Sequence, residues 1–160
     1  MRDSWLTGLA ERLNPATSRP DTGPWRAFLP RVFPAYFQSF GEHHAAFWEW
    51  LWQLERGTQP RPFVAVWPRG HGKSTSAEAA AVAVGARDVR SFVLYVSATQ
   101  EQADTHVQNI AVMLESPALA REYPDMAQPL LSKFGHSRGW RRNRLRTASG
   151  LNVDAIGLDT

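Results

Sequence analysis

The feature that most constrains the fold is a glycine-rich segment between an apolar run and an alanine-rich run. The apolar run, 63–67, has the sequence Phe-Val-Ala-Val-Trp, which is typical of a strand covered on both faces. It leads into Pro-Arg-Gly-His-Gly-Lys-Ser-Thr at 68–75. The alanine-rich run 76–84 follows and is closed by Gly85, as expected of a helix. The sequence therefore predicts a strand, a glycine loop and a helix in that order.

A second strand and helix follow along the chain. The apolar run Phe92–Val96 predicts another buried strand, and Thr99 is a suitable N-cap for the helix after it. That helix has an apolar stripe made of Ala103, Val107, Ile110, Ala111 and Leu114. Strands that alternate with helices predict a parallel α/β sheet with right-handed crossovers. Beyond Pro117 the pattern weakens, until 144–148 and 151–156 predict a hairpin.

The N-terminal part of the chain predicts helices and irregular structure. A short amphipathic helix is expected over Trp5–Leu13, the proline-rich stretch 18–34 is expected to be irregular, and a second helix is expected from about 41 to 56. In that second helix Trp48 and Trp52 share a face and are expected in the core, Trp50 is the better candidate for an external contact, and the His43-His44 pair is expected at its N-terminal surface. We divide the chain into a helical lead segment, 1–57, and a core, 58–160.

The glycine loop has the composition of a phosphate-binding loop. Such a loop needs small residues, so that backbone N–H groups converge on phosphate oxygens at a helix N-terminus, followed by a lysine and a hydroxyl. Gly72, Lys73 and Ser74 provide the second half of the pattern GxxxxGK[ST]. The first glycine of that pattern would fall at position 67, which is Trp67, and Gly70 partly replaces it.

This interpretation gives each loop residue a role. The backbone amides of six residues would hold the phosphates, namely Gly70, His71, Gly72, Lys73, Ser74 and Thr75. Lys73 would neutralise charge on the transferred phosphoryl group, and Ser74 would bind Mg²⁺. Two roles are open for Arg69, which either reaches the γ-phosphate as an arginine finger or pairs with a carboxylate. The alternative for the whole segment is a glycine-rich turn with an exposed lysine.

The charge of the chain is unevenly distributed. The net charge is +3, yet 133–146 contains six Lys or Arg residues and no carboxylate. Within it, Arg138, Arg141, Arg142 and Arg144 are candidates for contacting a DNA backbone or the nucleotide of a neighbouring subunit, and the alternative is a solvated basic loop. The chain has no cysteine, which excludes disulfides and thiolate metal sites, and it has no apolar run long enough to span a membrane. We expect a soluble, non-secreted protein.

Taken together, these motifs resemble the ATPase half of phage terminase large subunits. The resemblance rests on Val66–Thr75, on Leu94–Thr99 with Gln102-Ala103, and on Thr147–Gly150 with Asp154–Thr160, and it spans roughly 35–160. It implies a P-loop NTPase fold of the RecA-like type, with a parallel sheet flanked by helices that is incomplete at its C-terminal end. It further implies hydrolysis of ATP with Mg²⁺ to translocate double-stranded DNA into a procapsid. The implied partners are a portal protein, a small terminase subunit and further copies in a ring, in the cytoplasm of an infected host cell.

The resemblance breaks off before the acidic strand that would orient Mg²⁺ and the attacking water, and before the nuclease domain. The sequence therefore predicts a truncated ATPase domain that binds nucleotide but hydrolyses it poorly. Asp159 is an internal substitute for the missing carboxylate, although 151–156 fits a half-exposed hairpin better than a buried parallel strand. Two rival functions remain open, namely a non-catalytic nucleotide- or DNA-binding remnant and another P-loop enzyme of helicase-like or kinase-like type.

Overall fold

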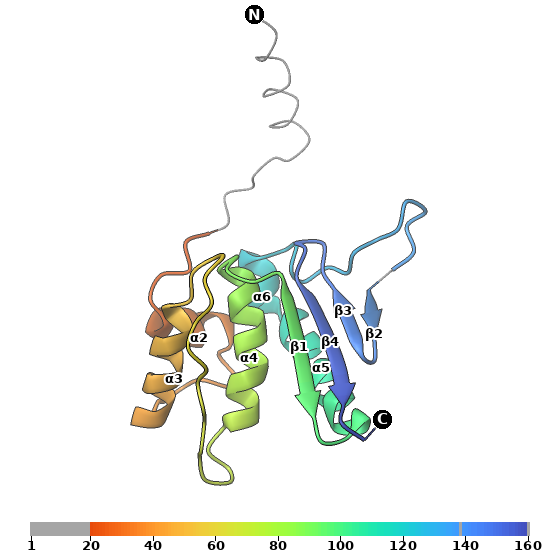
Figure 1. Ribbon diagram of the computed structural model, residues 1–160. Coiled ribbons are helices and arrows are strands. Elements are labelled where there is room, and N and C mark those ends of the chain that lie inside the picture. The colour runs from red at the N-terminus through yellow and green to blue at the C-terminus, as the bar shows by residue number, and fades with distance from the viewer. Residues whose placement is uncertain (1–19, 138, 160) are drawn as a thin grey trace, which may run out of the picture.

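A four-stranded sheet forms one side of the molecule in the computed structural model, which describes residues 20–137 and 139–159 (Figure 1). The strands are β1 (Phe92–Ser97), β2 (Trp140–Arg141), β3 (Arg144–Arg146) and β4 (Asn152–Gly157). The helices are α2 (Trp25–Val32), α3 (Glu42–Trp52), α4 (Lys73–Ala86), α5 (Gln100–Leu114) and α6 (Pro117–Glu122). No helix within the described ranges is both long and apolar enough to cross a membrane.

The sheet is mixed, with the order β1-β4-β3-β2. Strands β1 and β4 are parallel, with Phe92 opposite Asn152 and Ser97 opposite Gly157. The other two pairings, β4 with β3 and β3 with β2, are antiparallel. One parallel pair is thus present where the sequence predicted a parallel sheet, because the predicted C-terminal hairpin, with β2 beside it, adds antiparallel strands to the same sheet.

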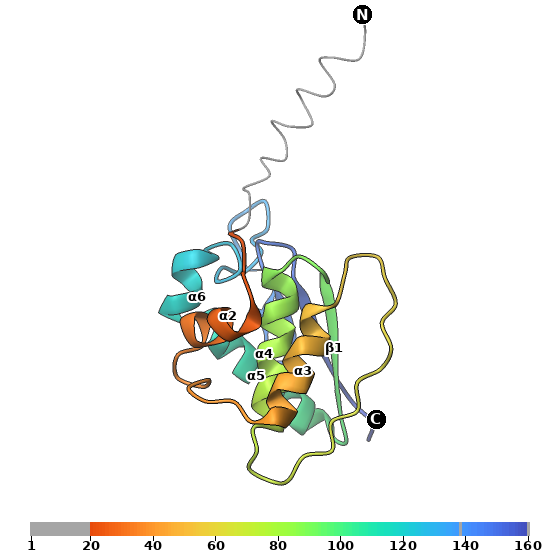
Figure 2. The same ribbon diagram turned by 90° about the vertical axis from the view of Figure 1, so that its left-hand side faces the viewer.

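The helices are layered on one face of the sheet. Helix α5 packs against β1 and β4, α4 packs against α5, and α3 and α2 lie beyond α4 (Figures 1 and 2). Arg87 ties α3 to α4, because its guanidinium donates to the carbonyls of Leu51 and Trp52 at 2.8 Å each, at the C-terminal end of α3. One hydrophobic core includes residues on both sides of the predicted boundary at 57/58, among them Phe28 and Trp48 on one side and Val82 and Ile110 on the other.

The opposite face of the sheet is open to solvent. Exposure alternates along β1, so that Phe92, Leu94 and Val96 are exposed while Val93 and Tyr95 face α5. The prediction that this strand is covered on both faces was therefore wrong. Helices pack on only one side of it, and its continuous apolar run does not distinguish the two sides.

The apolar run 63–67 also differs from its prediction, because it is extended but is not a strand of the sheet. Val64 and Val66 are 78% and 88% exposed, while Phe63, Ala65 and Trp67 are half-buried. Phe63 and Trp67 contact Phe47 of α3 edge to face, with ring centroids 5.4 and 5.9 Å apart. The segment therefore packs on α3 through alternate side chains and has no neighbouring strand within 20–137 and 139–159.

Several local predictions are confirmed. Helix α5 begins after Thr99, whose side chain accepts a hydrogen bond from the N–H of Gln102 at 3.2 Å, and its stripe residues Val107 and Ile110 are fully buried. Strands β3 and β4 form the expected hairpin around Gly150. Two predictions need correction, since the stretch expected to be irregular contains α2 with Pro30 inside it, and the second helix ends at Trp52. The helix expected over 5–13 lies outside the described residues.

Candidate phosphate-binding site

The glycine loop leads directly into α4 and has the backbone conformation that only glycine adopts easily. Gly70 has a φ of 83° and Gly72 has a φ of 70°, both in the left-handed region. Gly72 is followed at once by the right-handed backbone of α4, which begins at Lys73. A left-handed residue followed by a right-handed one, as at Gly72 and Lys73, turns successive N–H groups toward one point and forms an anion-binding concavity.

The N-terminus of α4 is open for a ligand. Its first N–H groups have no partner within the helix, no side chain of the described residues caps them, and its first turn carries no acidic residue. Lys73 and Ser74 are exposed at this end, and the helix is 14 residues long. The positive end of the helix dipole therefore combines with a lysine, a hydroxyl and backbone donors, which together favour an anion such as a phosphate.

The loop lies at the same end of the molecule as the carboxyl ends of β1 and β4 (Figure 1). In open α/β sheets this end carries the ligand site, because the loops that follow parallel strands meet there. Arg69 is exposed in the loop and makes no ion pair among the described residues. Pairing of Arg69 with a carboxylate, one of its two open roles, is therefore not seen among the described residues.

A histidine from α3 contacts the loop, which the sequence did not predict. The ring of His44 lies with Nε2 2.9 Å from the carbonyl oxygen of His71, and its Nδ1 accepts a hydrogen bond from the N–H of Gly41 at 3.0 Å. In the sequence, His44 is 27 residues from its loop partner His71 but only 3 residues from Gly41 at the start of the helix. No local sequence pattern predicts the contact between His44 and His71. The His43-His44 pair was expected only to lie at the N-terminal surface of the helix.

Three histidines and Trp67 gather beside the loop. The ring of His43 lies 4.0 Å from that of His44, 5.4 Å from that of His71 and 5.0 Å from that of Trp67, measured between centroids. Partial burial lowers the pKa of His43, and the neighbouring His44 and His71 lower it further. The lowered pKa favours the neutral form of the His43 ring, while the side chains of Lys73 and Arg69 bring formal positive charges to the loop.

The turn after β1 is joined to the end of β4 by Gln100. Its side chain accepts a hydrogen bond from the N–H of Gly157 at 2.9 Å, and its backbone N–H donates to Oδ1 of Asp159 at 2.9 Å. Gly157 lies against the backbone of Gln100 so closely that a Cβ would overlap it. Asp159, the internal substitute for the missing catalytic carboxylate, thus has a structural partner at the N-terminus of α5.

A buried polar cluster lies between α4 and α5. Nδ1 of His106 and Nδ2 of Asn109 lie 2.6 and 2.9 Å from the same carboxylate oxygen of Glu78, which is 4% exposed. The ring of Tyr95 stacks on that of His106, and burial, together with the charge of Glu78, raises the pKa of Tyr95 to about 12. The cluster fixes the face of α4 that follows the loop, because a buried carboxylate needs these donors.

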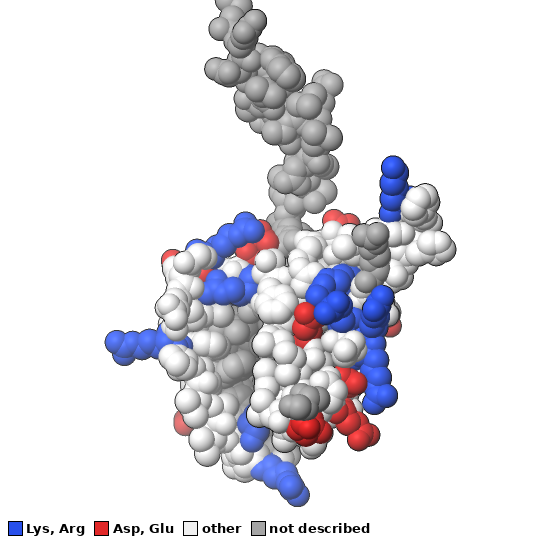
Figure 3. Space-filling view, turned by 45° about the vertical axis from the view of Figure 1, so that its right-hand side comes forward, with Lys and Arg blue, Asp and Glu red and all other residues white. Residues whose placement is uncertain are grey.

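The arginine-rich surface is less free than its sequence suggested. Arg142 pairs with Asp104 at 3.2 Å, Arg144 pairs with Asp154 at 3.2 Å, and Figure 3 shows acidic side chains beside basic ones on this face. Arg141 is exposed and makes no ion pair in the described ranges, while Arg138 lies outside them. Two of the four candidate residues, Arg142 and Arg144, are therefore paired internally.

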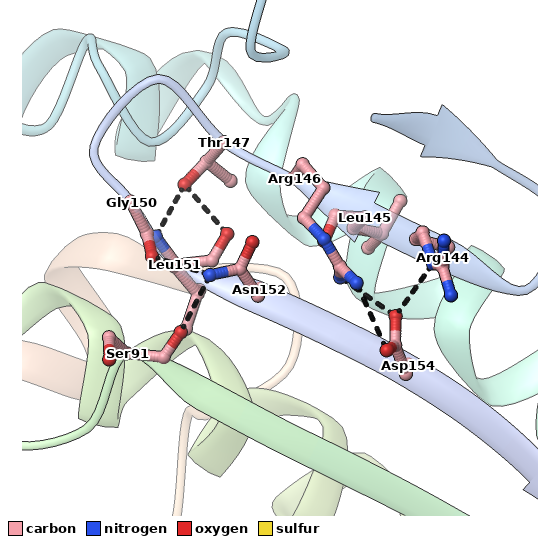
Figure 4. A network of polar contacts seen from close by, with 9 residues as sticks. All are labelled: Ser91, Arg144, Leu145, Arg146, Thr147, Gly150, Leu151, Asn152 and Asp154. Carbon is pink, nitrogen blue, oxygen red and sulfur yellow. Dashed lines mark hydrogen bonds and ion pairs between the residues drawn. The ribbon is translucent and has the colours of Figure 1, made fainter. Parts of the chain in front are cut away.

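Asp154 is the centre of the strongest of these pairings (Figure 4). Arg146 donates to both of its carboxylate oxygens, at 2.7 and 3.0 Å, and Arg144 adds a third contact. The hydrogen bonds from Arg146, followed by the positive charges of Arg146 and Arg144, lower the pKa of Asp154 below its ordinary value of 3.8. The same hairpin is closed by Thr147, whose hydroxyl oxygen accepts from the N–H of Leu151 at 3.0 Å.

Replacing Asp154 with asparagine is expected to lower the free energy of unfolding at pH 7 by about 1 kcal/mol, because the charge-assisted bonds from Arg146 become weaker. The folded-state pKa is depressed, so the wild-type stabilisation is complete above pH 3.8 and is lost as the pH falls below that value. Asp154→Asn should lose less stability than the wild type over that acid range. Urea unfolding at pH 7 and pH 3 measures both effects, and the exposed Asp125→Asn is the control. Equal acid sensitivity in wild type and Asp154→Asn would contradict the assignment.

Comparison with known proteins adds no identification. No family model matches the chain, and no curated protein and no solved structure matches it significantly.

Proposed function

We propose that this chain is an ATP-binding domain of terminase type that hydrolyses ATP to move double-stranded DNA. The observation that carries the proposal is the loop 68–72 with its two left-handed glycines at the open N-terminus of α4, directly before Lys73 and Ser74. The position of that loop at the same end of the molecule as the carboxyl ends of two parallel strands supports the same ligand class. The resemblance of the motifs to terminase large subunits narrows the proposed ligand from a phosphate-containing molecule in general to ATP.

In this proposal the chain's own residues hold the nucleotide. The backbone N–H groups from Gly70 to Thr75 bind the phosphates, and Lys73 neutralises their charge. The Ser74 hydroxyl would be a ligand of a Mg²⁺ ion that is bound together with ATP. The residues fit this group because the concavity, the lysine and the hydroxyl occur together on an exposed helix start. Arg69 supplies a further guanidinium at the loop, with no internal partner among the described residues.

The wider assignment follows the resemblance. DNA would contact the hairpin of β2 and β3, where Arg141 is exposed. Arg142 and Arg144 are exposed as well, although each forms an ion pair with an aspartate that is largely buried. The portal protein, the small terminase subunit, a ring of copies and the host cytoplasm belong to the same proposal. The fold would be that of a RecA-like P-loop NTPase.

A series of nucleotides tests the proposal directly. Calorimetric affinities with Mg²⁺ should rise from adenosine through AMP and ADP to ATP, because each added phosphate gains loop contacts. Equal affinities across the series, or no binding of ATP, would reject a phosphate-binding loop. Turnover separates the rivals. Stimulation by double-stranded DNA favours the motor, stimulation by short single strands favours a helicase-like enzyme, and ATP binding without turnover favours the remnant.

A further inference from the structure

We infer that His44 is a positioning residue for the phosphate loop, because it fixes the peptide between His71 and Gly72 and so aims the N–H of Gly72 at a bound phosphate. The inference rests on the proposed function, since it assigns His44 a role toward the phosphates of that same ligand. It starts from two hydrogen bonds of a single ring, one to the first residue before α3 and one to the loop.

The tautomer of His44 follows from its partners. The backbone N–H of Gly41 has a hydrogen to donate, so Nδ1 of the neutral ring, 3.0 Å away, is the acceptor. The proton of the neutral ring is then on Nε2, which donates to the carbonyl oxygen of His71 at 2.9 Å. Both ring nitrogens of His44 are therefore hydrogen-bonded, and the ring joins the start of α3 to the loop.

The contact determines the direction of the next N–H group. In a trans peptide the C=O and N–H groups point in opposite directions, and the described part of the chain contains no cis peptide. A His71 carbonyl held on the α3 side therefore turns the Gly72 N–H to the opposite side, away from α3. At a φ of 70°, Gly72 is the left-handed residue of the concavity, so this N–H is among those that converge there.

The loop has few other restraints on this peptide. Within it the N–H of His71 reaches the carbonyl of Pro68 at the long distance of 3.4 Å, and His71 itself is exposed. Nε2 of His44 lies 3.7 Å from the position that a Cβ on Gly72 would take, so the ring also lies against the glycine. Removing the ring would leave the peptide free to rotate, and bound phosphate would then have to order it.

Two conservative variants separate the two hydrogen bonds. Counting bonds from Cβ, the amide nitrogen of glutamine matches Nε2 of histidine, whereas the amide oxygen of asparagine matches Nδ1. His44→Gln therefore keeps a donor for the loop, and His44→Asn keeps only the acceptor for Gly41. We expect His44→Asn to weaken Mg-ATP binding about tenfold while His44→Gln stays within about twofold of the wild type.

The experiment measures Mg-ATP affinity by calorimetry, the melting temperature, and amide hydrogen exchange of 68–76 in the full chain. Faster exchange at 68–73 in His44→Asn, rescued in His44→Gln, is the expected accompanying result. Equal affinities for wild type and His44→Asn, or equal losses in the two variants, would overturn the positioning role. Lys73→Ala separates this outcome from failure of the proposed function. If Lys73→Ala weakens ATP binding and His44→Asn does not, only the inference about His44 fails, and if the wild type binds no ATP, both fail.

Discussion

Replacing Lys73 with alanine is expected to weaken Mg-ATP binding about 10- to 100-fold, because the loop loses its cationic donor to the phosphates. Lys73 is the first residue of α4 and is exposed, so its removal creates no cavity and leaves the hydrophobic core unchanged. Where the wild type turns over ATP, the rate should fall by about 10²–10³. Calorimetry with Mg-ATP and a phosphate-release assay measure these losses, and the melting temperature without nucleotide should stay near that of the wild type.

The chain offers a matched control for this change. Its only other lysine is Lys133, which is also exposed but lies in the long loop before β2. Lys133→Ala removes the same charge from the molecule, so it corrects for any general effect of net charge on a polyanionic ligand. An equal loss of ATP affinity in both variants would show nonspecific attraction, and an unchanged affinity in Lys73→Ala would remove the phosphate loop from the proposal.

What the sequence predicted well is local in origin. The start of α5 follows from Thr99 and the apolar stripe behind it, since a cap and a 3.6-residue period are properties of neighbouring residues. The hairpin follows from the turn at Ser149-Gly150 for the same reason, and Gly150 has the positive φ that its position implies. The glycine loop was located correctly before α4, which begins three residues earlier than the alanine-rich run suggested, at Lys73.

What the sequence predicted poorly depends on which segments meet. Five consecutive apolar residues at 63–67 imply burial on both faces, but a strand also needs a neighbour, and the run carries no information about one. The same limitation applies to β1, whose apolar residues are covered on one face only. In the arginine-rich stretch, the acidic partners Asp104 and Asp154 lie outside the counted segment, so its charge looked more available than it is.

The residues of the candidate site show the same difference between local motifs and contacts that join distant segments. Gly72, Lys73 and Ser74 were predicted as phosphate-binding residues from their order in the chain, because a phosphate loop is a contiguous motif. The contact of His44 with the loop joins residues 27 positions apart, and two adjacent histidines at a helix start give no signal of it. The residues of contiguous motifs are therefore predictable, whereas the residues that orient them depend on how α3 docks beside the loop.

The docking of α3 gives the second prediction with a large effect. Trp48 of α3 is fully buried and contacts Phe37, Phe47 and Trp52 through edge-to-face ring pairs with centroids 5.2 to 6.2 Å apart. Replacing Trp48 with alanine should lower the free energy of unfolding by about 3–5 kcal/mol, because the side chain leaves a cavity that the surrounding rings fill only in part. Native domains have about 5–15 kcal/mol in total, so the variant should be close to unfolding at 37 °C.

Trp48→Phe is the informative companion to this variant, because the indole N–H of Trp48 is buried without a hydrogen-bond partner among the described residues. Phenylalanine removes that unpaired donor and keeps an aromatic ring, so the relief of the desolvation cost offsets part of the lost packing and the net change should stay below about 1.5 kcal/mol.

Trp50→Ala should cost less than Trp48→Ala, since Trp50 is only half-buried and donates to the carbonyl of Arg61 at 3.0 Å. Urea unfolding of the three variants gives the order, and a loss below 1 kcal/mol in Trp48→Ala would mean that α3 is not packed as described. Because α3 also carries His44, Trp48→Ala should loosen the loop as well, which amide exchange at 68–73 would reveal below the melting temperature.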